Sequence, residues 1–134
     1  MLAPPGVASR GGGLLVSTRD VKEALGSLPA TVRTIAITGS GEPPSIDDLD
    51  AMAVDLETGW DAVASGRPVT EAVKVVEAGW VTGSLDRSGL ISVSPPILID
   101  REVLGSVLSD LSEDAWIDPI QALVAGGGKV RIRP

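Results

Sequence analysis

The spacing of apolar residues along this 134-residue chain changes several times, and each change marks an expected element. In four stretches the apolar residues recur every three or four positions, which is the spacing of one helix face. A Ser, Thr or Asp that can cap a helix stands at the start of each stretch. We therefore expect helices over residues 18–28, 46–58, 100–111 and 119–125.

Short β-branched runs between these stretches predict strands. Strands are expected over residues 14–16, 33–38, 61–64 and 129–133. A strand at 33–38 followed by a glycine-containing loop and a helix is the unit that places ligands at the C-terminal edge of an α/β sheet. The length fits one domain. We expect a single α/β domain over residues 14–134, preceded by a Pro/Gly-rich flexible tail at 1–13.

Residues 68–99 follow a different pattern, PVTEAVKVVEAGWVTGSLDRSGLISVSPPILI. Two β-prone runs, 73–76 and 80–85, flank a turn at 77–79, and a second turn at 86–89 leads into a strand at 90–94. We expect Pro95 and Pro96 to stop that strand. Such a hairpin is marginal alone, so it needs a sheet or another subunit to pack against.

The same stretch carries a family resemblance. PVTEAVK, then a turn, LDRSGL and SPP resemble the dimerising arm of the 2-C-methyl-D-erythritol 4-phosphate cytidylyltransferases of the non-mevalonate isoprenoid pathway. Their pattern is P-V-x-D-T-x-K, a hairpin tip, D-R-x-G-L-W and T-P-Q, with one residue more than this chain has between Leu90 and Ser94. The end of the chain also looks like the family's A-L-V-E-A-L-G-G-x-V-x-L-V.

The resemblance implies the C-terminal part of that family's domain: a partial Rossmann-like nucleotidyltransferase sheet with flanking helices and a protruding β-arm at about residues 68–94. It also implies a homodimer formed through the arm, with a full-length paralogue as a further candidate partner.

Three candidate substrate-binding residues follow from the resemblance alone: Arg87, Lys74 and Ser94. Arg87 matches the arginine that reaches the substrate phosphate of the partner subunit, and bidentate Arg–phosphate pairing gives this role a physical basis. The alternative, a local Asp86–Arg87 pair facing water, stays equally open. Lys74 matches the lysine of P-V-x-D-T-x-K, and Ser94 can stand in for the hydroxyl of T-P-Q.

Other positions depart from the family pattern. Ala72 stands where the family has Thr, Ile91 where it has Trp and Pro96 where it has Gln. Gly39 and Glu42 stand at the Asp and Arg of H-D-A-A-R-P, and Glu42 would repel the phosphate that the Arg attracts. We also find no counterpart of the segments P-A-A-G-x-G-x-R and N-I-K-x-T.

Nucleotidyl transfer depends on positive charge placed around phosphates and metal. The expected function is therefore that of a catalytically impaired, dimerising module, with no catalytic residue assigned. Mg²⁺ and CTP are expected as ligands only if the protein is active. The alternative is active or complemented CTP-dependent cytidylyl transfer to 2-C-methyl-D-erythritol 4-phosphate.

The amino-acid composition excludes several kinds of functional site and partner. The chain has no Cys and no His, which excludes disulfides, thiolate metal sites, cysteine nucleophiles and Ser-His-Asp triads. A net charge of −7 argues against nucleic-acid binding, which draws its strength from Lys and Arg. No stretch resembles a signal peptide or a membrane span, so we expect a soluble cytoplasmic protein without a membrane partner.

Three glycine-rich motifs and one acidic cluster are interpreted structurally. Gly11–Gly13 is expected to be a linker, Gly39–Gly41 a tight turn, and the GGGK at 126–129 a helix end, because none has the full pattern of a phosphate loop. The carboxylates of the 46–58 helix suggest either a cation site or, preferably, a solvated helix face. They are Asp47, Asp48, Asp50, Asp55 and Glu57.

Overall fold

A computed structural model describes residues 9–10, 15–38 and 44–133. Its centre is a mixed four-stranded sheet in the order β3-β7-β4-β9, in which β7 runs antiparallel to both of its neighbours and β4 runs parallel to β9. The strands are β3 (Thr34–Ile37), β4 (Ala62–Pro68), β7 (Ile91–Asp100) and β9 (Val130–Arg133).

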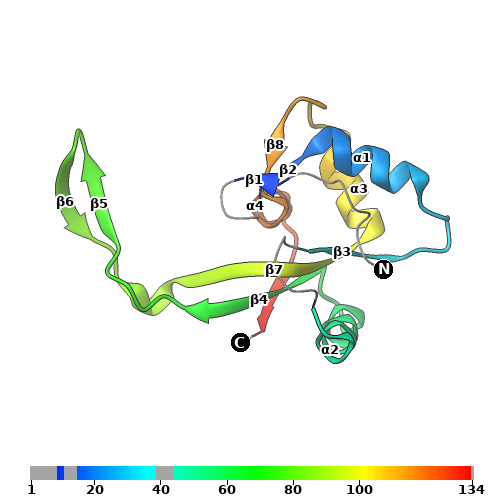
Figure 1. Cartoon of the computed structure of the whole chain (residues 1–134), viewed down its shortest axis with the longest axis horizontal. Helices are drawn as coiled ribbons and strands as arrows, with labels where there is room; N and C mark the ends of the chain where they lie inside the picture. Colours follow the sequence, from blue (N-terminus) through cyan, green and yellow to red (C-terminus); the bar gives the residue numbers. More distant parts are fainter. Residues whose placement is uncertain (1–8, 11–14, 39–43, 134) are drawn as a thin grey trace.

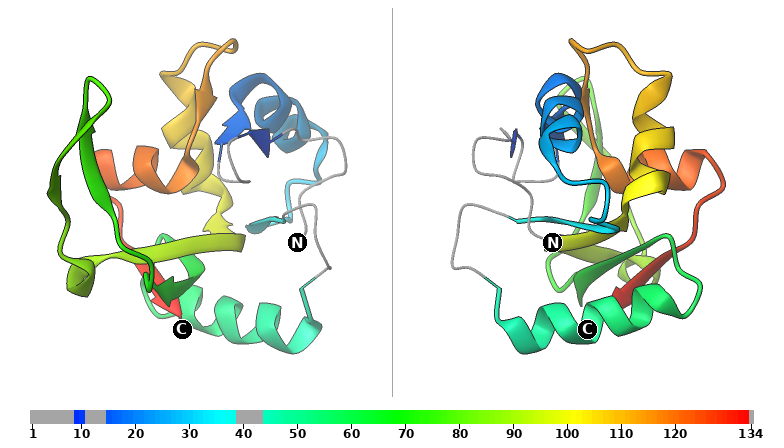
Figure 2. Two further views of the ribbon diagram at one scale, coloured as in Figure 1. Left: turned by 60° about the vertical axis from the view of Figure 1, so that its left-hand side comes forward. Right: turned by 90° about the vertical axis from the view of Figure 1, so that its right-hand side faces the viewer.

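Helices cover both faces of this sheet (Figure 1). Helices α1 (Thr18–Ser27), α3 (Arg101–Ser109) and α4 (Pro119–Ala125) lie on one face, and α2 (Ile46–Glu57) lies on the other, as the two views of Figure 2 also show. Alternation along the strands explains the two layers. On β7, for example, Ile97 and Ile99 pack toward the three-helix side, whereas Leu98 packs toward α2. The expected α/β fold with flanking helices and a protruding hairpin is confirmed.

The predicted helix caps are also confirmed. Side-chain oxygens of Ser17, Ser45, Asp100 and Asp118 each accept a hydrogen bond from a backbone N–H in the first turn of the following helix. These bonds satisfy donors that a helix start otherwise leaves without a partner. The first three helices end one or two residues before their predicted ends, where a Pro, Gly or Asp breaks the pattern, and the fourth ends at Ala125 as predicted.

Two strand predictions are wrong in extent. We expected strands at 61–64 and 90–94, but β4 runs on to Pro68 and β7 continues through Pro95 and Pro96 to Asp100. The two prolines, joined by a cis peptide bond, fall where the ladder shifts from the Ala64↔Ile97 pair to the next paired residues. A bulge accepts residues without an N–H donor, so prolines there do not end the strand.

A second, small sheet was not expected. Strand β1 (Ser9–Arg10) pairs with β2 (Leu15–Ser17), which pairs with β8 (Trp116–Ile117). Ser9 and Arg10, which we expected to belong to the tail, thus pair with β2. Two-residue strands carry no periodicity, which is why the sequence pattern missed β1 and β8.

Arg101, at the start of α3, holds the end of α1 in place. Its guanidinium donates hydrogen bonds to backbone carbonyl oxygens of Leu25 (2.9 Å), Pro29 (2.5 Å) and Val32 (3.2 Å). Helix α1 has no basic residue in its last turn. Arg101 therefore supplies, from another helix, the positive charge that favours a helix C-terminus. No helix in the described part of the chain is long and apolar enough to cross a membrane.

Candidate functional site

The arm, residues 68–94, leaves the body of the protein along β4 and β7 and ends in a two-stranded hairpin (Figure 1). Strands β5 (Lys74–Glu77) and β6 (Trp80–Ser84) pair antiparallel around Ala78 and Gly79. Both turn residues have positive φ, 50° and 84°, as a tight hairpin turn requires. The predicted hairpin is confirmed, and every residue of its two strands is exposed.

Lys74 lies at the base of the hairpin. Its Nζ donates a hydrogen bond to the Oγ of Ser84, 2.7 Å away on the paired strand. An ammonium group has three donors, so this contact leaves donors for a ligand. The side chain is exposed on an isolated two-stranded ribbon, away from the main sheet.

Arg87 begins a single 3₁₀ turn, Arg87–Gly89, between the hairpin and β7. Its guanidinium donates a hydrogen bond to the backbone oxygen of Thr70. Asp86 does not contribute to that bond; its carboxylate caps the turn by accepting from the Ser88 N–H at 3.0 Å. This bond from the Ser88 backbone lowers the pKa of Asp86 below its usual value. The side chains of Asp86 and Arg87 thus have separate partners within the arm.

Ser94 lies on β7 beside the bulge, paired with Ser65 of β4. It is exposed, and it is separated from the 3₁₀ turn by the strand residues from Ile91 onward. At about 3.3 Å per strand residue, Ser94 lies roughly 10 Å along the strand from Ile91. Within one chain the three candidate residues are thus distributed along the arm. They line neither the pocket between α3 and α4 nor the pocket beside Arg101.

Of the departures from the family pattern, Ile91 and Pro96 lie on β7. Ala72 is exposed in the segment between β4 and β5. Gly39 and Glu42, together with the predicted Gly39–Gly41 turn and the Gly11–Gly13 linker, lie outside the described residues.

Asp55 differs from the expectation of a solvated helix face. Its Oδ2 accepts hydrogen bonds from Arg131 Nε at 3.1 Å and from Arg133 Nη1 at 2.5 Å, and its side chain is only 19% exposed. The bond from Arg133 is the main reason why the pKa of Asp55 is lowered, with Arg131 adding to it. The signal in the sequence was the alternation in KVRIR, which places both arginines on one face of β9. The other four carboxylates of this helix are exposed.

The GGGK motif ends α4, as expected. The N–H groups of Gly126, Gly127 and Gly128 donate to carbonyl oxygens of α4, and Gly127 has a φ of 87°. Because these donors already have partners, they are not available to surround a phosphate.

Comparison with known proteins identifies similar sequences. No family model matches it. A bifunctional enzyme IspD/IspF from Clavibacter michiganensis subsp. michiganensis is 31% identical over 116 residues, which are 85% of this chain and 28% of that enzyme.

Solved structures agree with this relationship at the level of the fold. A 4-diphosphocytidyl-2C-methyl-D-erythritol synthase from Anaerococcus prevotii superposes with a TM-score of 0.70 at 16% identity, over 85% of this chain and 54% of that one. A 2-C-methyl-D-erythritol 4-phosphate cytidylyltransferase from Thermus thermophilus superposes with a TM-score of 0.68 at 18% identity, over 98% of this chain and 69% of that one. The chain thus spans little more than half of the first of these structures and about a quarter of the curated relative.

Proposed function

We propose that this chain, which is related to the IspD cytidylyltransferases of the methylerythritol phosphate pathway, acts as a dimerising interaction module and transfers no cytidylyl group by itself. The proposal rests on the arm and on the residues that stand at the family's phosphate-binding positions.

The observation that carries the proposal is the apolar surface of the arm. Trp80 is 77% exposed, and its neighbour Val81 is 64% exposed. Six of the nine exposed large hydrophobic residues in the described part of the chain lie on the arm: Val75, Val76, Trp80, Val81, Leu85 and Ile91. Apolar residues gathered on a projecting ribbon mark an interaction site, because an isolated two-stranded hairpin is marginal in water.

The charges around the arm support impaired chemistry. Of the basic residues assigned by resemblance, Arg87 bonds to Thr70 and Lys74 to Ser84 within the same arm. Ala72 has no hydroxyl to offer a phosphate. By resemblance, Glu42 adds a negative charge where the family has a positive one. Phosphoryl and nucleotidyl transfer need the reverse balance.

Dimerisation is tested by sedimentation velocity over a concentration series. Val76 and Val81 face each other across the hairpin, so we expect the double substitution Val76→Thr/Val81→Thr to weaken the dimer. Each Val→Thr change removes one methyl group, so the double substitution removes four from a two-fold interface. At about 0.8 kcal/mol of burial energy each, the binding free energy falls by about 3 kcal/mol, which raises the dissociation constant by roughly a hundredfold.

The matched control replaces two equally exposed valines on α2 and α4, Val54→Thr/Val124→Thr, and it should leave the dimer unchanged. A wild-type chain that stays monomeric throughout the series, or two double variants with the same effect, would refute the arm as the interface.

Catalysis is tested separately, by pyrophosphate release from CTP with 2-C-methyl-D-erythritol 4-phosphate and Mg²⁺. We expect no release from the folded chain. Release that Arg87→Ala abolishes and the exposed Arg33→Ala does not would support the alternative function, active cytidylyl transfer in which Arg87 binds a phosphate. Because the two assays are independent, the dimer can be confirmed while the loss of activity is refuted.

A further inference from the structure

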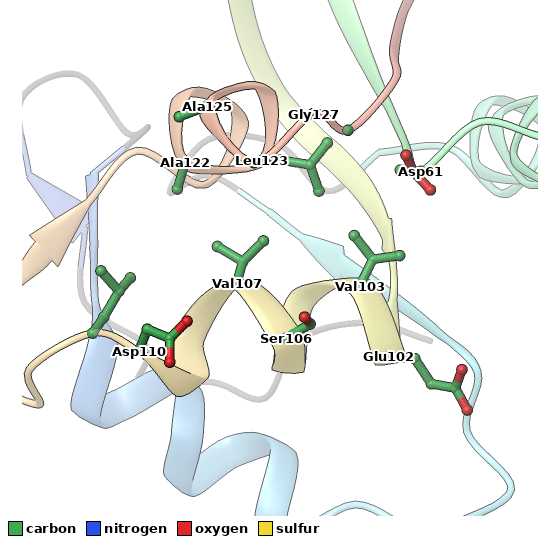
Figure 3. A pocket seen from close by; sticks show the side chains of 13 residues that line it. Asp61, Glu102, Val103, Ser106, Val107, Asp110, Ala122, Leu123, Ala125 and Gly127 are labelled. Atoms are coloured by element: carbon green, nitrogen blue, oxygen red, sulfur yellow. The ribbon is translucent and has the colours of Figure 1, made fainter.

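An open groove lies between α3 and α4, on the three-helix side of the sheet and apart from the arm (Figure 3). Its volume is about 820 Å³. Val103 and Val107 of α3 face Leu123 of α4 across it, and Leu111 also lines it. Leu123 is fully buried, whereas the two valines and Leu111 are half-buried.

Small residues keep the groove open on the α4 side. Ala122, Ala125 and the three glycines that end α4 form this wall, with no long side chain to fill the space. A β-carbon at Gly128 would lie 2.6 Å from Leu123 Cγ. The glycine turn is therefore packed closely against Leu123, which fixes the position of that wall. The groove is therefore formed by two packed helices together with the glycine turn that ends α4.

The charged residues that line the groove are all acidic, and the nearest cation on α1, Lys22, donates a hydrogen bond to the backbone oxygen of the lining residue Leu111 at 3.1 Å. The lining includes Asp61, Glu102 and Asp110 and contains no Lys or Arg. The Asp61 carboxylate accepts the backbone N–H of Lys129 at 2.8 Å. The Glu102 carboxylate is 3.5 Å from Arg33, but both side chains are at least 75% exposed, so water screens this pair. Asp110 caps the end of α3 with its backbone N–H, which donates to Leu108, and its carboxylate has no hydrogen-bond or ion-pair partner among the described residues.

The acidic residues are spaced along one side of α3. Glu102, Ser106 and Asp110 recur every fourth position beside the apolar row of Val103 and Val107. Glu102 and Asp110 are eight positions apart, which is about 12 Å along a helix axis at 1.5 Å per residue. An apolar row beside an acidic row of this length matches a helix with an apolar face and two cations about eight residues apart.

We infer that the groove between α3 and α4 is a docking site for a cationic amphipathic helix of a partner protein. A second copy of this chain is a poor match, because its apolar arm carries three carboxylates against two cations and would bring further negative charge to the rim. This inference does not use the arm and does not rest on the proposed function.

The test uses the intact chain and a fluorescein-labelled helical peptide with an apolar face and lysines eight residues apart. Fluorescence anisotropy measures the affinity, and a peptide of the same sequence with glutamates in place of the lysines is the matched probe. We expect the cationic peptide to bind and the anionic peptide to fail. We also expect the affinity to fall as salt is raised, because exposed charges are screened over about 10 Å at 0.1 M ionic strength.

Two matched double variants locate the binding site. Glu102→Gln/Asp110→Asn removes the rim charges at exposed positions, and we expect it to weaken binding by about tenfold, since exposed charge pairs contribute modestly. Asp50→Asn/Glu57→Gln makes the same change of net charge on α2, outside the groove, and should leave the affinity within about twofold. A thermal melt of each variant confirms that it is folded.

Three outcomes would overturn the inference: the cationic peptide does not bind, both peptides bind equally well, or both double variants weaken binding equally. Amide shifts in a two-dimensional NMR spectrum give a further check. Perturbation confined to α3 and α4 supports the groove, whereas perturbation of the arm contradicts it. Release of bound peptide as the concentration of the chain is raised would show that a second copy occupies the groove and would also overturn the inference.

Discussion

Replacing Arg101 with Met should destabilise the fold more than replacing Arg33 or Arg87. Arg101→Met keeps most of the apolar stem and removes the guanidinium. What is lost is the set of hydrogen bonds to the end of α1 and to the segment that leads into β3. The substitution therefore isolates the connection between α1 and the start of α3.

The expected magnitude follows from the bond lengths. Three bonds, to the carbonyl oxygens of Leu25, Val32 and Pro29, are 3.2 Å or shorter, whereas the fourth, to Leu28, is 3.4 Å and adds little. Bonds to a charged donor contribute about 1.5–3 kcal/mol each when buried. Arg101 is half-buried, so water can replace it, and we take about 1 kcal/mol for each of the three. The free energy of unfolding should fall by about 3 kcal/mol, which lowers Tm by about 10 °C in a chain of this size.

The assay is urea unfolding followed by circular dichroism, with Arg33→Met as the matched control. Arg33 is an exposed arginine whose pair with Glu102 is 3.5 Å long and solvated, so its replacement should cost less than about 0.5 kcal/mol. Arg101→Lys should fall between wild type and Arg101→Met, because an ammonium group cannot span all three carbonyls. Equal losses for Arg101→Met and Arg33→Met would refute the reasoning.

Two further predictions concern Asp55 and the glycines. The Arg133 bond lowers the folded-state pKa of Asp55 below 3.8, so the stability contributed by the Asp55 carboxylate is present above pH 3.8 and is lost as the pH falls through the lowered pKa. Urea melts should show Asp55→Asn less stable than wild type at pH 7, with the difference shrinking in acid. A difference that stays constant with pH would contradict this. Gly66→Ala should cost about 1–3 kcal/mol, because its β-carbon would lie 2.4 Å from Ile132 Cγ2. In contrast, a β-carbon at Gly105 in α3 would meet no atom within 4 Å, so Gly105→Ala should raise Tm through a gain of about 1 kcal/mol in helix propensity. Thermal melts in which the two variants change Tm in the same direction would refute the packing argument.

Local chemistry in the sequence was enough to predict the helices and the hairpin. Ser45 and Asp100 are capping residues directly before amphipathic stretches, and Gly79 supplies positive φ between two β-prone runs. Such features act within about one turn of chain, so periodicity and capping rules detect them without any tertiary information. The resemblance to the cytidylyltransferases also came from the linear order of residues on the arm.

Features that depend on distant partners could not be predicted in this way. From the sequence pattern we interpreted Asp55 as one of five solvated carboxylates, because its partner Arg133 lies 78 positions away on β9. Arg101 gave no signal either, since the carbonyls that it binds lie 69 to 76 residues earlier, in α1 and in the segment that follows it. Pro95 and Pro96 were expected to end a strand, and only the pairing of β7 with β4 allows them to occupy a bulge.

The sequence by itself determined where helices begin, where the hairpin turns, and which residues the arm carries. The tertiary structure decided which charges meet, how far β7 extends, and that α3 and α4 leave an acidic groove between them. The reason is the range of the interactions: capping, turn chemistry and side-chain periodicity act between near neighbours in the chain, whereas ion pairs, bulge positions and grooves require segments that only folding brings together.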